Sequence, residues 1–298
     1  MDIVFVYNSS LVDSVRKLDI LKYQFRSIAE NIPELDNIFF VVNDKTEFEN
    51  AYTNITFIEY KDIVPDYILN TTEYTIDYID LYITNIPNLS ENFIYIRENW
   101  FFLRHKNLFY DNFSILNFYK KKIGGSAFNK LINGEWGSYN FTLNYLLNNN
   151  KITTSEFDTI FNSYQIPYTL NVPIPLIKSK IYDYSQYIIN AFETDILFRE
   201  RQLNFNTSNI NNLNYLLYID YTYYLNNYIP ETIKTTQVKL TNSNDSILNK
   251  LNNITVNDCF LSLVNIDKIK TVEEFEEKKI LVNNWLEQRF PNKCKYEI

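Results

Sequence analysis

Polar residues that could do chemistry follow each of the apolar, strand-like segments in the first third of the chain. The apolar segments cover residues 3–7, 38–42, 55–58 and 93–96, and the polar segments behind them cover 8–10, 43–45, 59–62 and 97–99. Ligands of open α/β sheets bind at the carboxyl ends of parallel strands. We therefore expect the chemistry of this chain at those four polar segments.

Sequence motifs of the common enzyme classes are absent. The chain contains no GxGxxG, GxxxxGK[ST], HExxH or GxSxG. Its single histidine, His105, follows Arg104 just beyond a predicted strand and is better explained as a solvated loop residue than as a catalytic one. Cys294 has no neighbour in sequence that would activate a thiol. Neither a Ser-His-Asp triad nor a multi-histidine metal site is supported.

The elements that must position the polar segments follow from hydrophobic periodicity. Apolar residues recur at helical spacing over 15–28 and 73–85, between the predicted strands. The resulting order of strand, helix, strand, strand, helix, strand predicts an α/β fold with a mostly parallel sheet and covering helices. We expect this α/β core to occupy residues 1–123.

The second half of the chain reads as more helical. All four glycines lie between residues 124 and 137, beside three consecutive lysines at 120–122. This segment is either a surface connection or a flap over a ligand. Residues 138–298 are expected to complete the site, so that the whole chain is one integrated unit. The predicted elements are helices at 138–147, 155–164, 181–192, 211–226 and 272–289, an extended segment at 171–175, a loop at 241–253 and a strand at 254–260.

Composition excludes several classes of protein. The 298 residues include 36 acidic and 28 basic side chains, a net charge of −8, which argues against nucleic acid as a partner. No apolar run is long enough to span a membrane, and the N-terminus reads as a strand rather than a signal peptide. Two cysteines do not make a disulfide framework. We expect a protein of a reducing compartment, the cytoplasm.

Blocks of sequence along nearly the whole chain resemble the conserved regions of the Stealth family. The longest block starts at residue 21 and ends with Ile-Pro-Asn-Leu-Ser-Glu-Asn-Phe-Ile-Tyr at 86–95, similar to the family's I-P-G-L-S-E-x-F-I-Y. The other blocks are 2–10, 171–173 with 198–200, and 256–258 with 290–297. This family includes bacterial capsular-polysaccharide phosphotransferases and the enzyme that adds N-acetylglucosamine-1-phosphate to lysosomal hydrolases. The resemblance implies a Rossmann-like, glycosyltransferase-A-like fold.

The chain departs from the family pattern at several polar positions. Ser9-Ser10 replaces an acid or amide followed by glycine, and Asn171 replaces the histidine of H-x-P. Residues 96–99, Ile-Arg-Glu-Asn, stand where the family has Phe-Asn-Asp-Asp. Four family residues are retained: Arg26, Arg199, Asn257 and Asp258.

The resemblance implies transfer of a hexose-1-phosphate from a nucleotide-sugar to a glycan acceptor, with Mg²⁺ or Mn²⁺ as cofactor. Glu98 and Asn99 are the candidate metal ligands, and Asp258 would add a second carboxylate if the last block folds back onto the first sheet. Glu98, Asp258 and Asn171 occupy the catalytic positions, although the amide of Asn171 cannot take a proton near neutral pH. The candidate substrate-binding residues are Ser9, Arg26, Arg97, Arg199 and Asn257.

A second interpretation stays open. The substitutions at residues 9, 97, 99 and 171 also fit a catalytically degenerate homologue that binds a glycan, a nucleotide-sugar or a protein partner, which includes a second copy of the chain. In that case Glu98-Asn99 is an ordinary polar strand end. Arg199, next to Glu200 and Arg201, then belongs to a surface ion-pair cluster.

Overall fold

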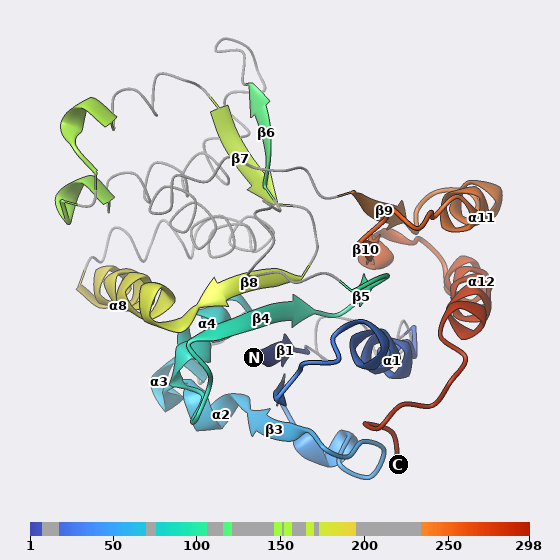
Figure 1. Cartoon of the computed structure of the whole chain (residues 1–298), viewed down its shortest axis with the longest axis horizontal. Coiled ribbons are helices and arrows are strands. Elements are labelled where there is room, and N and C mark those ends of the chain that lie inside the picture. The colour runs from blue at the N-terminus through green and yellow to red at the C-terminus, as the bar shows by residue number, and fades with distance from the viewer. Residues whose placement is uncertain are drawn as a thin grey trace.

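The structure is a computed structural model, and it describes nine parts of the chain. These are residues 1–7, 18–69, 76–105, 116–120, 146–150, 152–156, 165–169, 173–194 and 234–298. Figure 1 shows the described elements as two neighbouring α/β units, with the C-terminal segment returning to the first of them.

The first unit is built on a five-stranded sheet. Its order is β3-β2-β1-β4-β8, with all neighbours parallel except the antiparallel pair of β4 and β8. The strands are β1 Asp2–Val6, β2 Asn37–Val42, β3 Thr56–Glu59, β4 Asn92–Arg97 and β8 Ile174–Ile177. The inner strands are nearly continuous apolar runs because helices cover both faces of the sheet.

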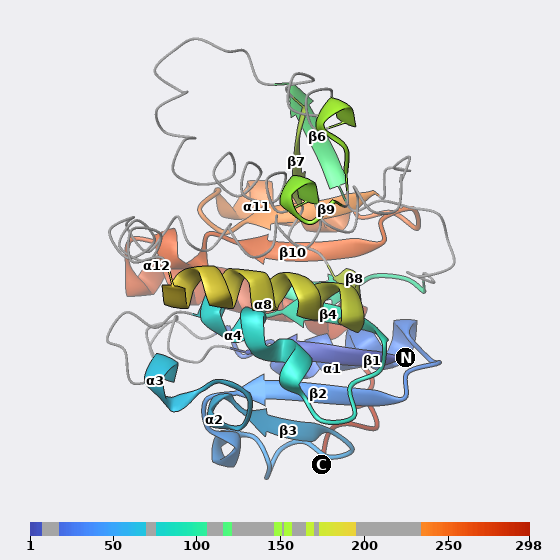
Figure 2. The same cartoon turned by 90° about the vertical axis from the view of Figure 1, so that its left-hand side faces the viewer.

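Helices cover the two faces of this sheet from opposite sides. In Figure 2, α4 (Ile76–Tyr82) and α8 (Lys178–Thr194) lie in front of the strands and α1 (Leu21–Asn31) lies behind them. Helix α1 buries Leu21, Phe25 and Ile28 against the strands, at the spacing of one helical face. It ends at Asn31 because Pro33 disfavours the helical conformation of the residue before it. The short helices of this unit are Lys45–Glu47, α2 Tyr60–Ile63, α3 Asp66–Leu69 and Ile83–Asn85.

The second unit has a three-stranded sheet of its own. Its order is β5-β10-β9, formed by Trp100–Phe102, Phe260–Val264 and Thr235–Lys239. Helices α11 (Asn244–Asn252) and α12 (Val272–Arg289) pack on it and enclose a second hydrophobic core. A 3-10 turn, Ile266–Lys268, connects β10 to α12. Elsewhere β6 (Leu116–Lys120) and β7 (Gln165–Thr169) form an antiparallel pair.

The predicted α/β class and the Rossmann-like, mostly parallel sheet are confirmed. The strands and helices expected before residue 100 are present in the predicted order, although the first described helix begins at Leu21. The helices expected at 181–192 and 272–289 are also present, as α8 and α12. The described parts of 138–298 add strands β7 to β10 to this helical half, and neither β7 nor β9 was predicted.

Two local predictions were wrong. Residues 244–252, expected as a loop, form helix α11, whose Ser243 side chain accepts a hydrogen bond from the Ser246 amide. Ile247 and Leu251, four residues apart, supply its buried face. The strand expected at 254–260 begins only at Phe260, because residues 254–257 turn around the side chain of Asp258.

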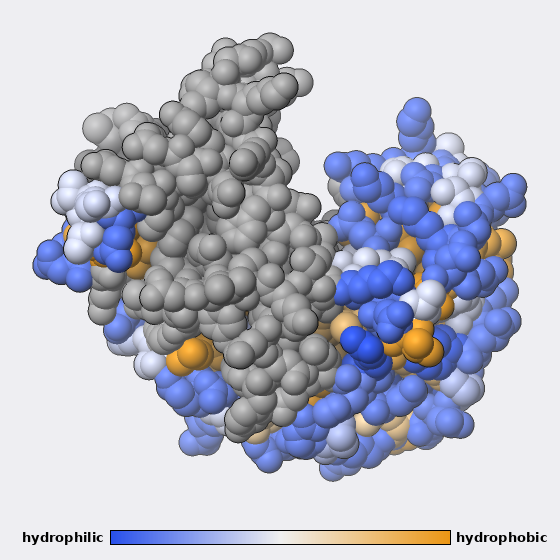
Figure 3. All heavy atoms as spheres, turned by 45° about the horizontal axis from the view of Figure 1, so that its top comes forward, coloured by the Kyte–Doolittle hydropathy of each residue, from blue (hydrophilic) through white to orange (hydrophobic). Residues whose placement is uncertain are grey.

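The described surface is mostly hydrophilic. Figure 3 shows the hydrophobic residues on one face as small separate spots in a polar surface. The large hydrophobic side chains that are exposed lie far apart in the sequence: Tyr182, Leu248, Val256, Val272, Ile280 and Ile298. Single exposed hydrophobic residues are normal on a protein surface and do not by themselves mark a binding site.

Candidate functional site

The strand order of the first sheet reverses beside β1. The chain runs outward through β2 and β3 on one side of β1 and then returns to add β4 on the other side. The carboxyl ends of β1 and β4 are direct neighbours, with Val6 opposite Arg97. In open α/β sheets, ligands bind at such a reversal, outside the carboxyl ends of the strands. Tyr7 and residues 97–99 occupy this position.

Arg97 is held at the end of β4 by a buried acid. Its guanidinium forms an ion pair with Asp80 of α4, and its Nε donates to the Tyr95 hydroxyl at 2.6 Å. The same hydroxyl donates to the other oxygen of Asp80 at 2.7 Å. The carboxylate of Asp80, on a residue that is 2% exposed, therefore neutralises the positive charge that Arg97 brings to the edge.

Glu98 directly follows Arg97, so its backbone lies next to the end of β1. Burial raises the pKa of the Tyr7 phenol, and the negative charges of Glu98 and Glu47 raise it further. The ring of Tyr7 is fixed by edge contacts with Phe5 and Phe48, at centroid distances of 6.5 and 5.3 Å. Glu98 is half-buried and is the acidic residue at the carboxyl end of β4, beside the reversal of strand order.

Asn99 makes the turn between the two sheets. Its φ of 68° is in the left-handed region, which asparagine tolerates better than most residues. The turn takes the chain from β4 in the first sheet to β5 in the second. The Asn99 carbonyl then accepts a hydrogen bond from the Leu263 amide at 3.0 Å. Asparagine at this position therefore has a backbone role in addition to the predicted metal contact.

Asp258 is buried in a complete shell of donors. Lys234 Nζ approaches its carboxylate at 2.8 Å, the Thr236 hydroxyl at 2.7 Å, and the amide and hydroxyl of Thr255 at 2.8 Å each. Burial raises the pKa of Asp258, but the hydrogen bonds from Lys234 and the two threonines outweigh it and bring the value to about 2. This carboxylate is consequently anionic and firmly held.

The structure does not bring Asp258 to Glu98. The pairing of β5 with β10 places Ser262 opposite Trp100 and Phe260 opposite Phe102. Glu98 precedes one end of β5, and Asp258 precedes β10 at the opposite end. In this register residue 98 stands opposite residue 264, six positions from Asp258. Six strand positions correspond to roughly 20 Å, so the two carboxylates are too far apart to share one cation. Asn257, next to Asp258, is exposed at the same distant end.

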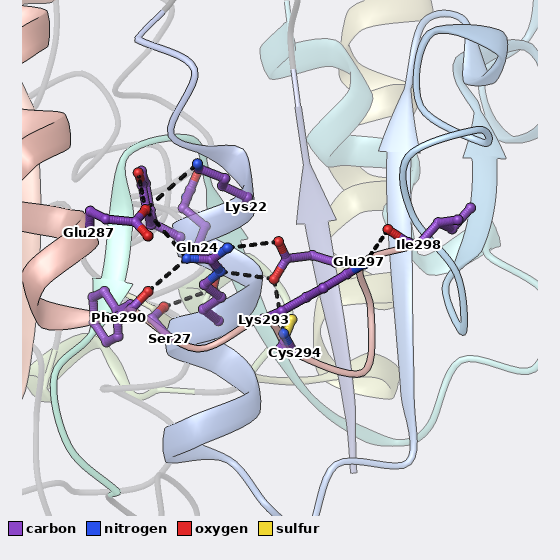
Figure 4. Close-up of polar contacts among 11 residues, drawn as sticks. Lys22, Gln24, Ser27, Glu287, Phe290, Lys293, Cys294, Glu297 and Ile298 are labelled. Carbon is purple, nitrogen blue, oxygen red and sulfur yellow. Dashed lines mark hydrogen bonds and ion pairs between the residues drawn. The ribbon is translucent and has the colours of Figure 1, made fainter.

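Arg26 joins the second sequence block to the last one. Its Nε and Nη2 bind the two carboxylate oxygens of Glu297 at 2.9 and 3.0 Å, and its Nη1 donates to the Phe290 carbonyl at 2.9 Å. Figure 4 shows Glu297 lying against α1, with Glu287 and Phe290 on the other side of the cluster. Both side chains of the pair are about nine-tenths buried. Arg26 thus anchors the C-terminal segment to α1.

The remaining predicted site residues lie outside the described part of the chain. They are Ser9, Asn171 and Arg199, and the glycine-rich segment 124–137 lies outside it as well. Residue 173 is described, and the chain enters β8 at Ile174, opposite Tyr95. The start of β8 therefore lies at the same edge of the sheet as the end of β4.

Sequence reasoning missed two residues that shape this edge. Asp80 lies between Ile79 and Leu81 in α4 and belongs to no recognisable motif, so only the fold reveals it as the partner of Arg97. Gln24 lies inside the longest sequence block but carries no charge that would draw attention. Its buried amide Nε2 donates to the carbonyls of Arg97 and Trp100, at 3.1 Å each.

The described carboxylates alone could not hold a metal ion at the carboxyl ends of β1 and β4, so such a metal would need further ligands. Within the nine described parts, no group of three His, Cys, Asp or Glu side chains is placed to hold a metal ion. Glu98 offers one carboxylate. Mg²⁺ is commonly bound by one or two carboxylates together with substrate phosphates, and one carboxylate plus a diphosphate fits that mode.

The fold defines a Rossmann-like α/β protein. Its candidate site is acidic and lies at the carboxyl ends of β1 and β4. Residues 14–120 match the family model of Stealth protein CR2, conserved region 2. This match confirms the resemblance for the longest sequence block, which starts at residue 21 and ends at residue 95, and the other blocks lie outside it. The match contains Arg26, Arg97, Glu98 and Asn99, whereas Asn257 and Asp258 lie outside it.

Two curated relatives match a similar fraction of the chain. One is the exopolysaccharide phosphotransferase cps2G of Lactiplantibacillus plantarum, 32% identical over 91 residues, which are 30% of this chain and 26% of that protein. The other is the capsular polysaccharide phosphotransferase LcbA of Neisseria meningitidis, 30% identical over 95 residues, which are 30% of this chain and 25% of that protein. The match thus spans about a quarter of each relative.

One solved structure resembles the chain over its length. It is the apo form of the glycosyltransferase GlyE of Streptococcus pneumoniae, with 10% sequence identity and a TM-score of 0.42. The alignment covers 99% of this chain and 65% of that one. Separately, none of the helices among the described residues combines the length and the apolar character needed to cross a membrane.

Proposed function

We propose that the chain transfers a hexose-1-phosphate from a nucleotide-sugar to a hydroxyl of a glycan. In this reaction the acceptor oxygen bonds to the phosphorus that carries the sugar, and the bond from that phosphorus to the nucleoside monophosphate breaks. The hydroxyl proton passes to a base and the nucleoside monophosphate leaves. The observation that carries the proposal is the Stealth match over residues 14–120, which contains the carboxyl end of β4.

Glu98 has the central role in this proposal. Its carboxylate lies beside Tyr7, at the reversal of strand order where a nucleotide-sugar would bind. With the diphosphate of the donor it would hold Mg²⁺ or Mn²⁺, and the cation would neutralise the charge of the diphosphate. Asp258 has no part in this step, because it lies at the far end of β10 and its low pKa makes it a poor proton acceptor.

Release of uridine monophosphate tests the proposal. Purified protein is incubated with UDP-glucose or UDP-N-acetylglucosamine, Mg²⁺ or Mn²⁺, and a mixture of methyl glycosides as acceptors. We expect slow, metal-dependent and acceptor-dependent release of UMP. Release that needs neither metal nor acceptor, or no release and no donor binding at all, would contradict the proposal.

Substitution of Glu98 locates the activity. Glu98→Gln keeps the volume of the side chain but removes the negative charge that a cation needs, so metal-dependent donor binding should fall at least tenfold, measured by calorimetry with Mn²⁺. Glu276→Gln, an exposed acid on α12, is the matched control and should bind as the unmodified chain does. Equal affinity of both variants would remove Glu98 from the site.

A second candidate function is binding of the nucleotide-sugar or of a glycan without turnover. The observation that favours it is the ion pairing of the described arginines: Arg97 is neutralised by Asp80 and Arg26 by Glu297. Neither guanidinium is presented to a diphosphate as a separate positive charge. Donor binding by calorimetry together with undetectable UMP release would favour this second function over the first.

A further inference from the structure

Gln24 spans the turn that carries Glu98. Its single Nε2 group donates one hydrogen bond to the Arg97 carbonyl and one to the Trp100 carbonyl, both at 3.1 Å. These two carbonyls stand immediately before and after Glu98-Asn99. An amide nitrogen has two hydrogen atoms, and here both are used on the two ends of one turn. The side chain of Gln24 therefore bridges the turn from the side of α1.

The orientation of this amide follows from its partners. If its oxygen and nitrogen were exchanged, the oxygen would face two carbonyl oxygens and both hydrogen bonds would be lost. In the observed orientation Gln24 Oε1 is buried and has no hydrogen-bond partner among the residues that the structure describes. A buried unpaired acceptor is unfavourable, and native structures contain few of them. The two donated bonds are thus what this residue contributes.

The turn needs such support because it leaves one sheet for another. Arg97 ends β4 in the first sheet, and Trp100 begins β5 in the second. Asn99 between them has a φ of 68°. From the second sheet, the Leu263 amide of β10 donates a hydrogen bond to the Asn99 carbonyl at 3.0 Å. The turn is therefore held from α1 by Gln24 and from β10 by Leu263.

We propose that Gln24 is a positioning residue that fixes the Glu98 carboxylate beside the end of β1. This inference rests on the proposed function for its consequence in binding, but the placement of the turn is independent of that function. Gln24 touches no substrate in this scheme. It acts through the backbone of residues 97–100, and its loss displaces Glu98 without changing the charge of the site.

Asn31 provides a matched control on the same helix. Its side chain is also buried and also donates to a carbonyl of β5, that of Phe102 at 3.2 Å. Phe102 is at the other end of β5, next to Leu103, whose amide donates to the Cys259 carbonyl at 2.9 Å. Gln24 and Asn31 therefore anchor the two ends of the same strand to α1, and only Gln24 anchors the end next to Glu98.

Hydrogen exchange of two amides separates positioning from general packing. In Gln24→Met, which is similar in size but cannot donate, the Leu263 amide should exchange at least tenfold faster, while the Leu103 amide changes less than twofold. In Asn31→Leu the pattern should be reversed. Equal acceleration of both amides in both variants would overturn the proposal. If Gln24→Met does not fold, Gln24→Asn replaces it, because its amide is one methylene too short to reach both carbonyls, and the same pattern is expected.

The affinity for the nucleotide-sugar donor tests whether the turn held by Gln24 matters for binding at Glu98. With Mn²⁺ present, Gln24→Met should bind UDP-glucose at least fivefold more weakly, and Asn31→Leu should bind as the unmodified chain does. Loss of affinity in both variants to the same extent would also overturn the role of Gln24. If the unmodified chain binds no donor while the exchange pattern is as expected, the proposed function fails and the positioning of the Glu98 turn by Gln24 stands.

Discussion

Arg26, Arg97 and Asp258 illustrate how a charged side chain can look functional in a sequence and be occupied within the fold. Each has a partner of opposite charge inside the chain: Glu297, Asp80 and Lys234. A buried charge that keeps its partner is tolerated, whereas one that loses it is strongly destabilising. The effect of substituting these residues is therefore expected first on stability. Glu98 follows β4 at the strand end where a ligand of an open α/β sheet is expected.

Asp258 should make folding pH-dependent. Its pKa is about 2 in the folded chain and close to 3.8 when unfolded, so the folded state binds its proton less readily. The stability that this carboxylate contributes is therefore complete above about pH 4 and is lost as the pH falls towards 2. Asp258→Asn should lower the free energy of unfolding by about 2 kcal/mol at pH 7, measured in urea.

The difference between Asp258→Asn and the unmodified chain should shrink as the pH falls from 4 towards 2. Glu276→Gln serves as the control, because its side chain is exposed and its removal should leave the free energy of unfolding within about 0.5 kcal/mol. A difference that stays constant from pH 7 to pH 2.5 would show that the hydrogen bonds around Asp258 do not depend on its charge.

At the scale of elements, the C-terminal segment completes the first unit. Tyr296 is buried in the first core against Phe25, and the backbone of residues 296–298 pairs with residues 51–53 through bonds of 2.9 and 3.1 Å. The Arg26–Glu297 pair fastens this segment to α1. Helix α1 therefore contacts the C-terminal segment on one side and, through Gln24 and Asn31, the strand β5 on another.

A double-mutant cycle measures the link between α1 and the C-terminal segment. Arg26→Met should lower the free energy of unfolding by about 3 kcal/mol, because it leaves the mostly buried carboxylate of Glu297 without its partner. Glu297→Gln should cost less, because Arg26 Nη1 keeps the exposed carboxylate of Glu287 at 3.5 Å. The double variant should lose clearly less than the sum of the two, since the uncompensated charge is then gone. Strict additivity in urea unfolding would mean that the two side chains do not interact in solution.

At the scale of the whole molecule, the two cores share elements. Helix α1 buries Phe25 and Ile28 in the first core and Tyr23 in the second. Phe260 of β10 belongs to the first core, while its neighbour Leu261 belongs to the second. Adjacent residues on one strand point to opposite faces, so a single strand contributes to both cores. Sharing of this kind favours the single integrated unit expected from the sequence.

Cooperative unfolding of the two cores tests this expectation. Leu286→Ala removes a fully buried side chain of α12 from the second core and should destabilise the chain by about 3 kcal/mol. If the units unfold together, the amides of β1 in the first sheet should lose as much protection from hydrogen exchange as those of β10. Protection lost in β9 and β10 alone would show two independent units.

The sequence by itself determined the alternation of strands and helices before residue 100 and the Stealth resemblance. Hydrophobic periodicity is a local property, so β1, β2, β4, α12 and the buried runs within them could be predicted from neighbouring residues alone. The same local reasoning placed Glu98 correctly at the end of a parallel strand. It misjudged α11, because a short polar helix depends on the packing of only Ile247 and Leu251.

Only the tertiary structure decided which charged residues share a site. The distance between Glu98 and Asp258 depends on the antiparallel register of β5 and β10, and the pairing of Arg26 with Glu297 joins residues 271 positions apart. Neither can be read from local pattern, because register and long-range contacts are set by how the helices and sheets pack together. The same packing brought Gln24, an uncharged residue in a helix, to the two ends of the turn that carries Glu98.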